Sequence, residues 1–437
     1  MLVAVMTDRA GRLPRDTSIS QLFRARHNHA VSTTRSTDAD VIVVGLGAMG
    51  CAVTHRLAER GLRVIGIDRD HPPHDRGSTH GDTRITRLAI GEGPEYAPLV
   101  RRSHALWREL EADSGATLMR QVGGLVIGDG DDPFLAQTRA NASRSEIPHE
   151  NLTLRALSER FPMFAAPPGT EAYLEREAGL LHPEAAVRAQ LSLARTAGAA
   201  LHPGPDVESW RADGDGVTVV TGDGPLNARE LVICAGAWIP RLLPEYEDLF
   251  EVHPQWLHWF PIREGYEALR TMPIFIWEMP GVRDAFTHLS AGFYGFPAID
   301  GPAGGVKLAT ERYEQPADPD LPLPAATGAR EAARLYAEYL ARFFPWVADT
   351  PLRTASCLYT NTRGSRFLIG PHPEQPHVTV VAACSGHGFK HSPAIGEAVA
   401  QLIVDGRSAI DLSPFALPSP AGPASARRAR NTRTSRA

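Results

Sequence analysis

The distribution of apolar residues predicts a strand, a helix and a second strand near the start of the chain. Val41–Val44 is an apolar run, a helical stretch follows a glycine-rich turn, and a second apolar run ends at Asp68. From about residue 246 to 350 the pattern changes to alternating apolar segments such as Ile274–Trp277 and Phe293–Phe296. The first pattern is typical of a doubly wound α/β unit, and the second predicts an antiparallel sheet.

Apolar spacing also predicts elements between and after these units. A helix-compatible spacing runs from Gly91 to Asp113, and helical patterns cover Ser143–Phe164 and Pro183–Gly198. Near the end, the apolar run Val378–Ala383 leads into a second glycine loop and a helix over Ala394–Asp405. We therefore expect both ends of the ordered chain to meet at one cofactor.

The turn after the first strand has the sequence of a dinucleotide-binding loop, GLGAMG at residues 45–50. Gly45 permits the tight turn, Gly47 lets the backbone approach a pyrophosphate, and Gly50 lets the helix pack on the sheet. The helix N-terminus favours phosphate charge, and Asp68 stands where a carboxylate accepts ribose hydroxyls. Two alternatives stay open: the glycines make an ordinary strand-to-helix turn, or the loop serves an NAD-dependent dehydrogenase.

Composition narrows the class of protein. The 437 residues are 43% hydrophobic and 22% charged, which is enough for a large core and two connected domains. A net charge of −5 without a long basic stripe argues against nucleic acid or an anionic membrane as partner. No apolar run reaches the roughly 18 residues of a spanning helix, and four cysteines are typical of a reducing compartment. We expect a soluble, cytoplasmic protein without a metal site.

The two ends of the chain differ from its body. Residues 1–38 carry six arginines and no clear periodicity, which predicts a disordered extension or an overlong assigned start, with a transit-like segment as the alternative. Beyond about residue 415, proline, alanine, serine and five arginines predict a disordered tail.

Six segments, in order along the chain, carry a resemblance to one enzyme family. They are VIVVGLGAMG at 41–50, GSTHGDTRITR at 77–87, FYGFP at 293–297, GVKL at 305–308, CLYT at 357–360 and SGHGFK at 385–390. Over about residues 40–412 the chain thus resembles the amine-oxidising flavoproteins of the D-amino-acid oxidase superfamily, typified by monomeric sarcosine oxidase and N-methyltryptophan oxidase. The resemblance implies FAD as the cofactor.

The expected fold class is α/β: a discontinuous Rossmann-like FAD-binding domain with an α+β substrate domain built on an antiparallel sheet. The expected boundaries are 39–110, 176–245 and 351–412 for the FAD-binding domain, 111–175 and 246–350 for the substrate domain, and 1–38 and 413–437 for the disordered ends.

The resemblance also implies a covalent link to the flavin. Cys357 lies in the Cys-x-Tyr-Thr setting in which the family's cysteine forms a thioether with the 8α-methyl carbon of FAD. Such a bond needs a thiolate, which an exposed cysteine beside a cation supplies. The alternative is a buried apolar cysteine, and this alternative is favoured for Cys51, Cys234 and Cys384.

Arg87 and Lys390 match the two cations that hold the substrate carboxylate in this family. A guanidinium fork binds a carboxylate through two parallel hydrogen bonds, and an ammonium adds a point charge. The alternative for each is a solvated surface charge. Tyr294 and Tyr359 match two tyrosines of the family's substrate cavity, with a place in the core as the alternative.

Two further cations are expected near the flavin ring. Lys307 matches the lysine that promotes reaction with oxygen, because a fixed positive charge stabilises developing superoxide. Arg84 matches a second cation, which alternatively anchors its loop or a phosphate. His387 is expected to pack against the flavin or to hydrogen-bond it. The expected cofactor-binding residues are Gly45, Gly47, Met49, Gly50, Asp68, Ser78, Thr83, Arg84, Cys357, Gly386, His387, Gly388 and Lys390.

The activity that the resemblance implies is oxidation of a secondary amino acid by a monomer, with the amino acid and O₂ as small-molecule partners. Hydride passes from the carbon beside nitrogen to FAD, water hydrolyses the imine, and O₂ becomes hydrogen peroxide. N-methyl amino acids such as N-methyltryptophan or sarcosine are the first candidates, and pipecolate-like cyclic amino acids the second. Beside this oxidase and the NAD-dependent dehydrogenase, a cofactor-binding protein without turnover is the third hypothesis.

The chain departs from the sarcosine-type pattern at one position. Glu311 stands near the place where those enzymes carry a histidine after the lysine, which changes the charge of one side of the pocket. Three tryptophans either line a larger apolar pocket or belong to the core: Trp256, Trp259 and Trp277.

Overall fold

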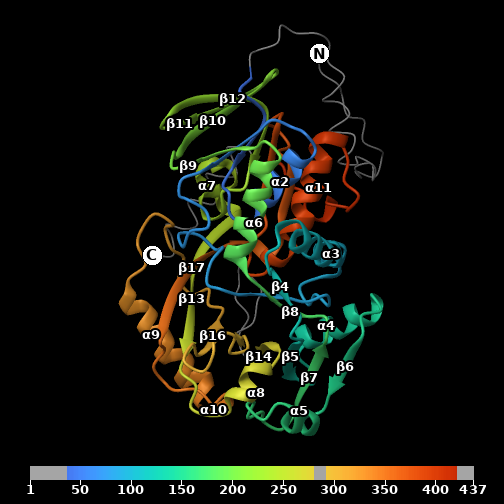
Figure 1. Cartoon of the computed structure of the whole chain (residues 1–437), viewed down its shortest axis with the longest axis vertical. Coiled ribbons are helices and arrows are strands. Elements are labelled where there is room, and N and C mark those ends of the chain that lie inside the picture. Colours follow the sequence, from blue (N-terminus) through green and yellow to red (C-terminus); the bar gives the residue numbers. More distant parts are fainter. Residues whose placement is uncertain (1–36, 280–291, 421–437) are drawn as a thin grey trace, which may run out of the picture.

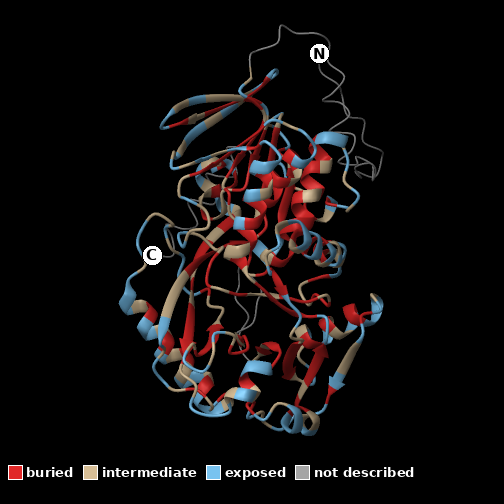
Figure 2. Cartoon of the chain, viewed as in Figure 1, coloured by how far each residue is buried: buried red, intermediate tan, exposed pale blue. Residues whose placement is uncertain are grey.

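The computed structural model describes residues 37–279 and 292–420, which form two large sheets with helices packed around them (Figure 1). Residues 1–36 of the expected extension and 421–437 of the expected tail lie outside the described residues. Figure 2 shows that buried residues gather along the inner faces of both sheets and of the helices that cover them.

The first sheet is assembled from three separated parts of the chain. Its strands are β1 Ala39–Val44, β2 Val64–Asp68, β9 Ala200–Pro203, β10 Val207–Asp213, β11 Gly216–Thr221, β12 Gly224–Ile233, β18 Leu368–Pro371 and β19 Val378–Ala382. The order is β10-β11-β12-β1-β2-β9, with β19 beside β12 and β18 beside β19. β1 pairs in parallel with β2 and β12, and β12 pairs in parallel with β19.

The central strand of this sheet is buried on both faces. Val41 and Val43 of β1 belong to one hydrophobic cluster, whereas Ile42 and Val44 belong to another on the opposite face. Because side chains alternate along a strand, a run of apolar residues without polar positions suits a parallel sheet that is covered on both sides. The continuous apolar pattern at 41–44 therefore has its physical cause in this double burial.

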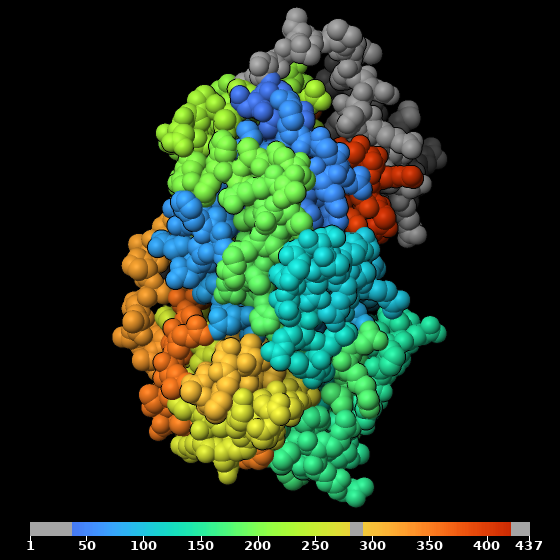
Figure 3. Space-filling model, viewed as in Figure 1, coloured from blue at the N-terminus to red at the C-terminus, as the bar shows by residue number. Residues whose placement is uncertain are grey.

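Four helices cover the face that includes Val41 and Val43. They are α2 Ala48–Glu59, α3 Ala97–Ser114, α6 Pro183–Thr196 and α11 Ser392–Asp405. α2 packs against both α6 and α11. The approach of α11 is close, since a Cβ atom on Gly396 would lie 2.6 Å from the carbonyl carbon of Ala52 in α2. Figure 3 shows the same contact from outside, with the C-terminal region (red) against the N-terminal region (blue).

The second sheet is mostly antiparallel. Its order is β17-β13-β16-β15-β14-β5-β7-β6, and only β14 and β5 among these neighbours run parallel. Its strands are β5 Gly124–Asp129, β6 His149–Leu152, β7 Thr170–Glu175, β13 Phe250–Phe260, β14 Ile274–Glu278, β15 Gly292–Gly295, β16 Val306–Thr310 and β17 Arg353–Thr362.

A small third sheet joins the two halves, and short helices complete the fold. Its strands are β3 Arg84–Thr86, β4 Met119–Arg120 and β8 Gly179–Leu181, in the order β3-β8-β4. The remaining α-helices are α4 Pro133–Arg144, α5 Leu154–Arg160, α7 Ile239–Leu242, α8 Tyr266–Thr271, α9 Ala325–Leu335 and α10 Ala341–Phe343. Helical turns lie at Pro94–Tyr96, Gly236–Trp238, Pro244–Leu249, Tyr336–Leu340, Arg363–Ser365, Phe389–His391 and Ser413–Phe415.

The α/β fold class is confirmed, and one predicted helix is wrong. Within Ser143–Phe164, α4 ends at Arg144, a strand forms over His149–Leu152, and α5 begins only after Thr153. The strand pairs with β7 at the edge of the second sheet. This pairing outweighs the local helical pattern, and Thr153 then starts α5 by accepting a hydrogen bond from the Ala156 N–H at 3.3 Å.

Two expectations on the domain boundaries also differ from the structure. β17 lies within 351–412, a part expected in the FAD-binding domain, yet it pairs with β13 in the second sheet. The expected tail from residue 413 begins with packed residues, because Phe415 is buried and the Tyr246 hydroxyl donates to the Pro418 carbonyl at 2.8 Å. In the part of the chain that the structure describes, no helix is both long and apolar enough to cross a membrane.

Candidate active site

A cavity of about 340 Å³ lies at the carboxyl ends of the parallel strands in the first sheet. The glycine loop after β1, Asp68 at the end of β2, and the loops after β12 and β19 all contribute to its wall. This is the edge at which doubly wound sheets bind their ligands. We call it the cofactor cavity.

Each of the three glycines of the first loop is explained by a different structural feature. Gly45 has a φ of +87°, and a Cβ atom there would lie 2.5 Å from the carbonyl oxygen of Cys234. A Cβ on Gly50 would lie 1.6 Å from the Gly45 carbonyl oxygen, so this position also excludes a side chain. By contrast, a Cβ on Gly47 would only touch the Thr79 hydroxyl at 3.4 Å. The protein's own packing therefore leaves Gly47 free to serve a ligand that approaches the backbone.

The N-terminus of α2 points its backbone donors at this cavity. Gly47 is the N-cap residue and has no side chain that could accept a hydrogen bond from the helix. The Ala48 N–H donates to the Thr79 hydroxyl at 3.2 Å, and both Gly47 and Met49 line the cavity. A helix start without an acceptor at its N-cap residue favours an anionic group such as a pyrophosphate.

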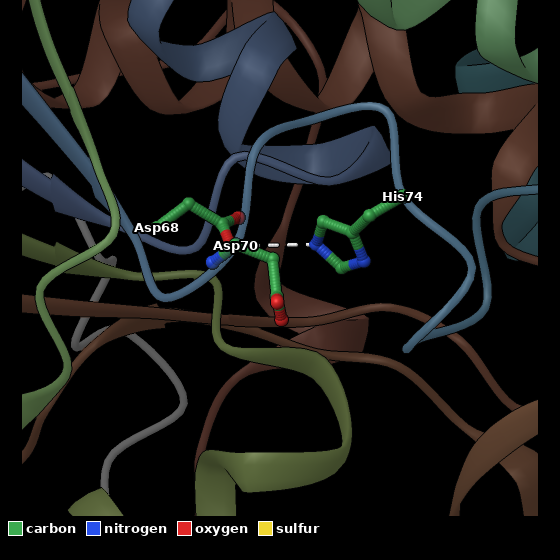
Figure 4. A group of neighbouring side chains, drawn as sticks. All are labelled: Asp68, Asp70 and His74. Carbon is green, nitrogen blue, oxygen red and sulfur yellow. Dashed lines mark hydrogen bonds and ion pairs between the residues drawn. The ribbon is translucent and has the colours of Figure 1, made fainter.

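Asp68 is held by the backbone of the glycine loop (Figure 4). Its Oδ2 accepts the Leu46 N–H at 2.7 Å, and its Oδ1 accepts the Asp70 N–H at 3.0 Å. His74 Nε2 lies 3.3 Å from the same Oδ1. Burial lowers the pKa of His74, but its hydrogen bond with Asp68 and the nearby carboxylates raise that pKa above the ordinary value. Asp68 is thus fixed in orientation at the place predicted for ribose binding.

The same three side chains offer ligand atoms within 4.8 Å of one another. Figure 4 shows Asp68, Asp70 and His74 beside one another, and Asp68 and His74 also line the cofactor cavity. Because Asp68 and His74 line the cofactor cavity and Asp68 contacts the backbone of the glycine loop, we interpret this cluster as part of the dinucleotide site.

A second cavity of about 130 Å³ adjoins the first. Four residues line both cavities: Arg84, Tyr359, Gly386 and Phe389. Ile276 of β14 and Tyr294 of β15, which are directly opposite each other in the second sheet, line it from below. We call it the substrate cavity, since a ligand in it would be next to one in the cofactor cavity.

Arg87 and Lys390 lie together in the substrate cavity, as predicted, but a carboxylate of the chain is already between them. The Arg87 Nη2 atom lies 2.6 Å from Glu92 Oε2, and the Lys390 Nζ atom lies 3.7 Å from Glu92 Oε1. Lys390 Nζ also donates to the His387 carbonyl at 2.7 Å. Both cations are buried, which contradicts the alternative of solvated surface charges.

The charges of this group depend on one another. Burial raises the pKa of Glu92, but Arg87 and Lys390 outweigh burial and hold that pKa far below its usual range. Burial lowers the pKa of Lys390 to about 8, against the opposing effect of Glu92. Sequence reasoning missed Glu92. The only available signal was an acidic residue five positions after Arg87, which is too common a spacing to indicate a contact.

Lys307 is buried with all three of its ammonium protons in use. Its Nζ donates to the Gly81 carbonyl at 2.6 Å, to the Thr83 carbonyl at 2.9 Å and to the Thr83 hydroxyl at 3.1 Å. The same atom lies 4.7 Å from the centre of the Phe296 ring. Burial, together with the Arg84 charge, brings the pKa of Lys307 well below its ordinary value. The three hydrogen bonds fix the position of the Lys307 Nζ atom at the wall of the substrate cavity.

Arg84 anchors its own loop, which is one of the two roles expected for it. Its Nη2 donates to the Ser78 carbonyl at 2.6 Å and its Nη1 to the Thr83 carbonyl at 2.8 Å. Because it also lines both cavities, anchoring and a place beside the ligand are compatible.

Cys357 is buried, with a side chain packed among Leu257, Ala309 and Tyr359. Burial raises the pKa of its thiol to about 11, although Arg84 opposes this rise. The expectation of an exposed cysteine is therefore wrong. Cys384 is more accessible: it lines the cofactor cavity, and its Sγ lies 3.7 Å from the Ser78 hydroxyl oxygen.

The other predicted residues fall into three groups. Those that line the cofactor cavity are Gly45, Gly47, Met49, Asp68, Ser78, Arg84, Tyr359, Gly386 and Gly388, and those that line the substrate cavity are Thr83, Arg84, Arg87, Tyr294, Lys307, Tyr359, Gly386, His387 and Lys390. Gly50 and Cys357 line neither cavity. The structure thus places Tyr294 and Tyr359 at a cavity rather than wholly in the core.

His387 and the three tryptophans have more specific positions. The His387 ring stacks on Phe367 with centroids 4.5 Å apart, and its Nε2 lies 3.1 Å from the Ser365 carbonyl oxygen. Of the tryptophans, Trp277 lines the substrate cavity, whereas Trp259 packs between Lys307 and Arg353. Trp256 packs against Gly328, where a Cβ would lie 2.6 Å from its ring.

The fold and the cofactor cavity define a dinucleotide-binding α/β protein, and a second cavity with two buried cations adjoins the first. Residues 40–402 match the family model described as FAD dependent oxidoreductase. The chain is 38% identical over 380 residues to a monomeric sarcosine oxidase of Streptomyces avermitilis, covering 86% of this chain and 96% of that protein. It is 33% identical over 385 residues to an N-methyl-L-tryptophan oxidase of Salmonella arizonae, covering 86% and 98%.

Solved structures agree with this match. NikD, an amino acid oxidase essential for nikkomycin biosynthesis, superposes with a TM-score of 0.75 at 28% identity, covering 88% of this chain and 98% of that one. An L-proline dehydrogenase from P. horikoshii, at 22% identity and a TM-score of 0.70, shares the fold. The chain belongs to the family of FAD-dependent oxidoreductases. The family match favours FAD over the alternative of an NAD-dependent dehydrogenase.

The residues of the cofactor cavity fit FAD. The start of α2, whose N-cap residue has no side chain, suits a pyrophosphate, Asp68 suits a ribose, and Gly47 leaves room for close approach.

Proposed function

We propose that this protein oxidises a secondary amino acid at the carbon beside nitrogen. The observation that carries this proposal is the pair of buried cations, Arg87 and Lys390, which bind a carboxylate inside a cavity next to the cofactor cavity. Relatives named for sarcosine and N-methyl-L-tryptophan, both secondary amino acids, support the same class of substrate.

In this proposal the substrate carboxylate replaces Glu92 between Arg87 and Lys390. The guanidinium fork of Arg87 fixes its orientation, and the Lys390 ammonium adds charge. Apolar side chains from the second sheet, including Ile276 and Trp277, then exclude water from the rest of the ligand. The amino acid is thereby held with its nitrogen end directed away from the two cations.

Bound FAD supplies the redox chemistry, accepting two electrons with a hydrogen from the substrate and passing them to O₂ to give hydrogen peroxide. Lys307 contributes a fixed positive charge at the cavity wall, which stabilises negative charge that develops on oxygen. Water hydrolyses the imine product, which for an N-methyl substrate yields an aldehyde.

We further propose that the Cys357 sulfur would replace one hydrogen of the flavin 8α-methyl group, with the two electrons of this oxidation left on the flavin and then passed to O₂. We also propose that the protein is a monomer. Cys357 and Tyr359 are two residues apart along β17, so their side chains point to the same side of the strand. Tyr359 lines the cofactor cavity. Arg84 favours the thiolate form of Cys357. The name of the Streptomyces avermitilis relative supports the monomeric state.

Anaerobic reduction of the purified holoenzyme tests the proposed function. We expect N-methyltryptophan, sarcosine or pipecolate to bleach the flavin absorbance, and admission of air to restore it with one equivalent of peroxide. An Arg87→Met variant should need a higher substrate concentration for the same rate. A flavin that none of these amino acids reduces would refute the function and leave a cofactor-binding protein without turnover.

A further inference from the structure

Glu311 is the first residue after β16 and lines the substrate cavity together with Arg87 and Lys390. Its Oε2 accepts the Tyr313 hydroxyl at 2.7 Å, and Tyr313 itself is buried. The carboxylate is therefore held in one orientation at the wall rather than turned to solvent.

Glu311 differs from Glu92 in having no cation of the chain as an ion-pair partner. Among the described residues, Glu92 pairs with Arg87 and Lys390, whereas Glu311 takes part in no ion pair within 4.0 Å. Removing a carboxylate from water without a cation is costly. A carboxylate kept in this way at a cavity wall is typical of a group that binds a ligand.

Glu311 adds a negative group to the cavity that holds the two cations. Arg87 and Lys390 are positive, and Glu92 neutralises one of these charges. The charges of Arg87 and Lys390 act on the Glu311 carboxyl group, so the three side chains are neighbours in the cavity, and Tyr359 lines the same wall. An amino acid carries the complementary charges, with a carboxylate at one end and an ammonium near it.

We propose that Glu311 binds the ammonium of the substrate and selects amino acids that carry a positively charged amine. The inference rests on the proposed function, because it assumes the carboxylate end at Arg87 and Lys390. The ammonium N–H donates to the Glu311 carboxylate, which gives this carboxylate a cationic partner. Before hydride transfer one ammonium proton passes to the Glu311 carboxylate, which leaves the nitrogen lone pair free to form the imine. Glu311 is thus a specificity residue that acts on the nitrogen of the ligand, one carbon away from the carboxylate that Arg87 binds.

Binding of two ligands of the same shape tests this role. Sarcosine carries an ammonium between its methyl and methylene groups, and methylthioacetate has an uncharged sulfur at that position. Their dissociation constants are measured on the anaerobic holoenzyme from flavin absorbance changes, using the concentration dependence of the reduction rate where reduction occurs. The variants are Glu311→Gln, which keeps the size of the side chain, and Glu311→Asp, which keeps its charge.

We expect Glu311→Gln to raise the dissociation constant of sarcosine by about tenfold or more, as for loss of a charged hydrogen bond. The dissociation constant of methylthioacetate should change by less than about twofold. Glu311→Asp should retain part of the preference for sarcosine. As a control, Glu92→Gln should change the dissociation constants of both ligands in the same direction. Equal effects of Glu311→Gln on both ligands, no effect on sarcosine, or no binding of either ligand to the unaltered protein would overturn the inference.

The same experiment separates this inference from the proposed function. If no secondary amino acid reduces the flavin but Glu311→Gln selectively weakens sarcosine binding, the proposed function fails and the ammonium site remains. If reduction occurs and the selectivity is absent, the function stands and Glu311 has no such role. An unchanged flavin spectrum and circular dichroism of each variant show that it has folded.

Discussion

Arg87 and Glu92 form an ion pair inside the substrate cavity, with 2.6 Å between Nη2 and Oε2. The Glu92 side chain is only 11% exposed, and Lys390 lies on its other side. The chain therefore carries its own carboxylate in the place where a substrate carboxylate is expected. Any carboxylate ligand has to compete with Glu92 for the same two cations.

This competition predicts that Glu92→Gln binds carboxylate ligands more tightly. The amide leaves both cations without an anionic partner, so we expect the dissociation constant of methylthioacetate to fall by about tenfold. The free protein should also unfold at a lower temperature, because breaking a buried pair costs about 3 kcal/mol, and the ligand should restore part of this loss. Titration of the flavin spectrum and thermal unfolding measure the two effects.

Glu95→Gln is the matched control, since it removes a carboxylate from the same loop and leaves the Arg87 pair intact. It should change neither quantity. Weaker ligand binding in Glu92→Gln than in the unaltered protein would show that Glu92 helps to hold the ligand instead of competing with it.

The pKa of Lys390 predicts a pH dependence of carboxylate binding. Burial lowers this pKa to about 8, and an anionic ligand prefers the protonated ammonium. Affinity should therefore be constant below pH 8 and fall above it, by up to about tenfold per pH unit. Methylthioacetate binding is measured from about pH 6 to about pH 10, roughly two units on each side of this pKa.

A Lys390→Arg variant distinguishes this group from others that titrate nearby. A guanidinium stays charged throughout the range, so the fall above pH 8 should vanish in the variant. The assignment to Lys390 is wrong if the unaltered protein shows a flat profile, or if the variant keeps the fall.

The contrast between Gly50 and Glu92 shows what the sequence could predict. The glycine loop, α2 and Asp68 follow one another within 30 residues, and their contacts depend on local backbone geometry, so the motif predicted them correctly. Glu92 acquires its role only because its loop packs against Lys390, almost 300 residues later. No local sequence pattern predicts such a contact, and none predicts the ion pair between Arg87 and Glu92.

The exposure of Cys357 could not be predicted for a related reason. Strand β17 was expected with the FAD-binding domain, but it pairs with β13 and buries Cys357 against Leu257 and Ala309. The resemblance identified the residue as a candidate, whereas its surroundings depend on which sheet its strand joins. Tertiary pairing of this kind decides burial for any strand whose sequence is compatible with either sheet.

Lys307 is predicted to act on the oxygen reaction more than on substrate oxidation. Its ammonium is fixed by Gly81 and Thr83 at the cavity wall, so its charge is available without reorganisation when negative charge develops on oxygen. We expect Lys307→Met to slow flavin reoxidation by about 10²-fold or more and to change anaerobic reduction much less. Stopped-flow measurement of the two half-reactions separates these effects.

Lys390→Met serves as the comparison, because it removes a buried cation of the same cavity at the carboxylate end. That variant should raise the substrate concentration needed for reduction and leave reoxidation nearly unchanged. Equal slowing of both half-reactions in Lys307→Met would mean that this lysine supports the structure of the cavity rather than the oxygen reaction.

Two cysteines are candidate sites of flavin attachment. Each site predicts a different result when its cysteine is replaced by serine. Cys384 lines the cavity directly, whereas Cys357 is buried behind Tyr359 and shares its side of β17. We expect Cys357→Ser to release free flavin on acid precipitation, while Cys384→Ser keeps the yellow colour in the pellet. If Cys384→Ser alone releases the flavin, accessibility outweighs the family motif and the thioether forms at Cys384. If the flavin is already released from the unaltered protein, the cofactor is held by the glycine loop, Asp68 and the walls of the cavity without a covalent bond.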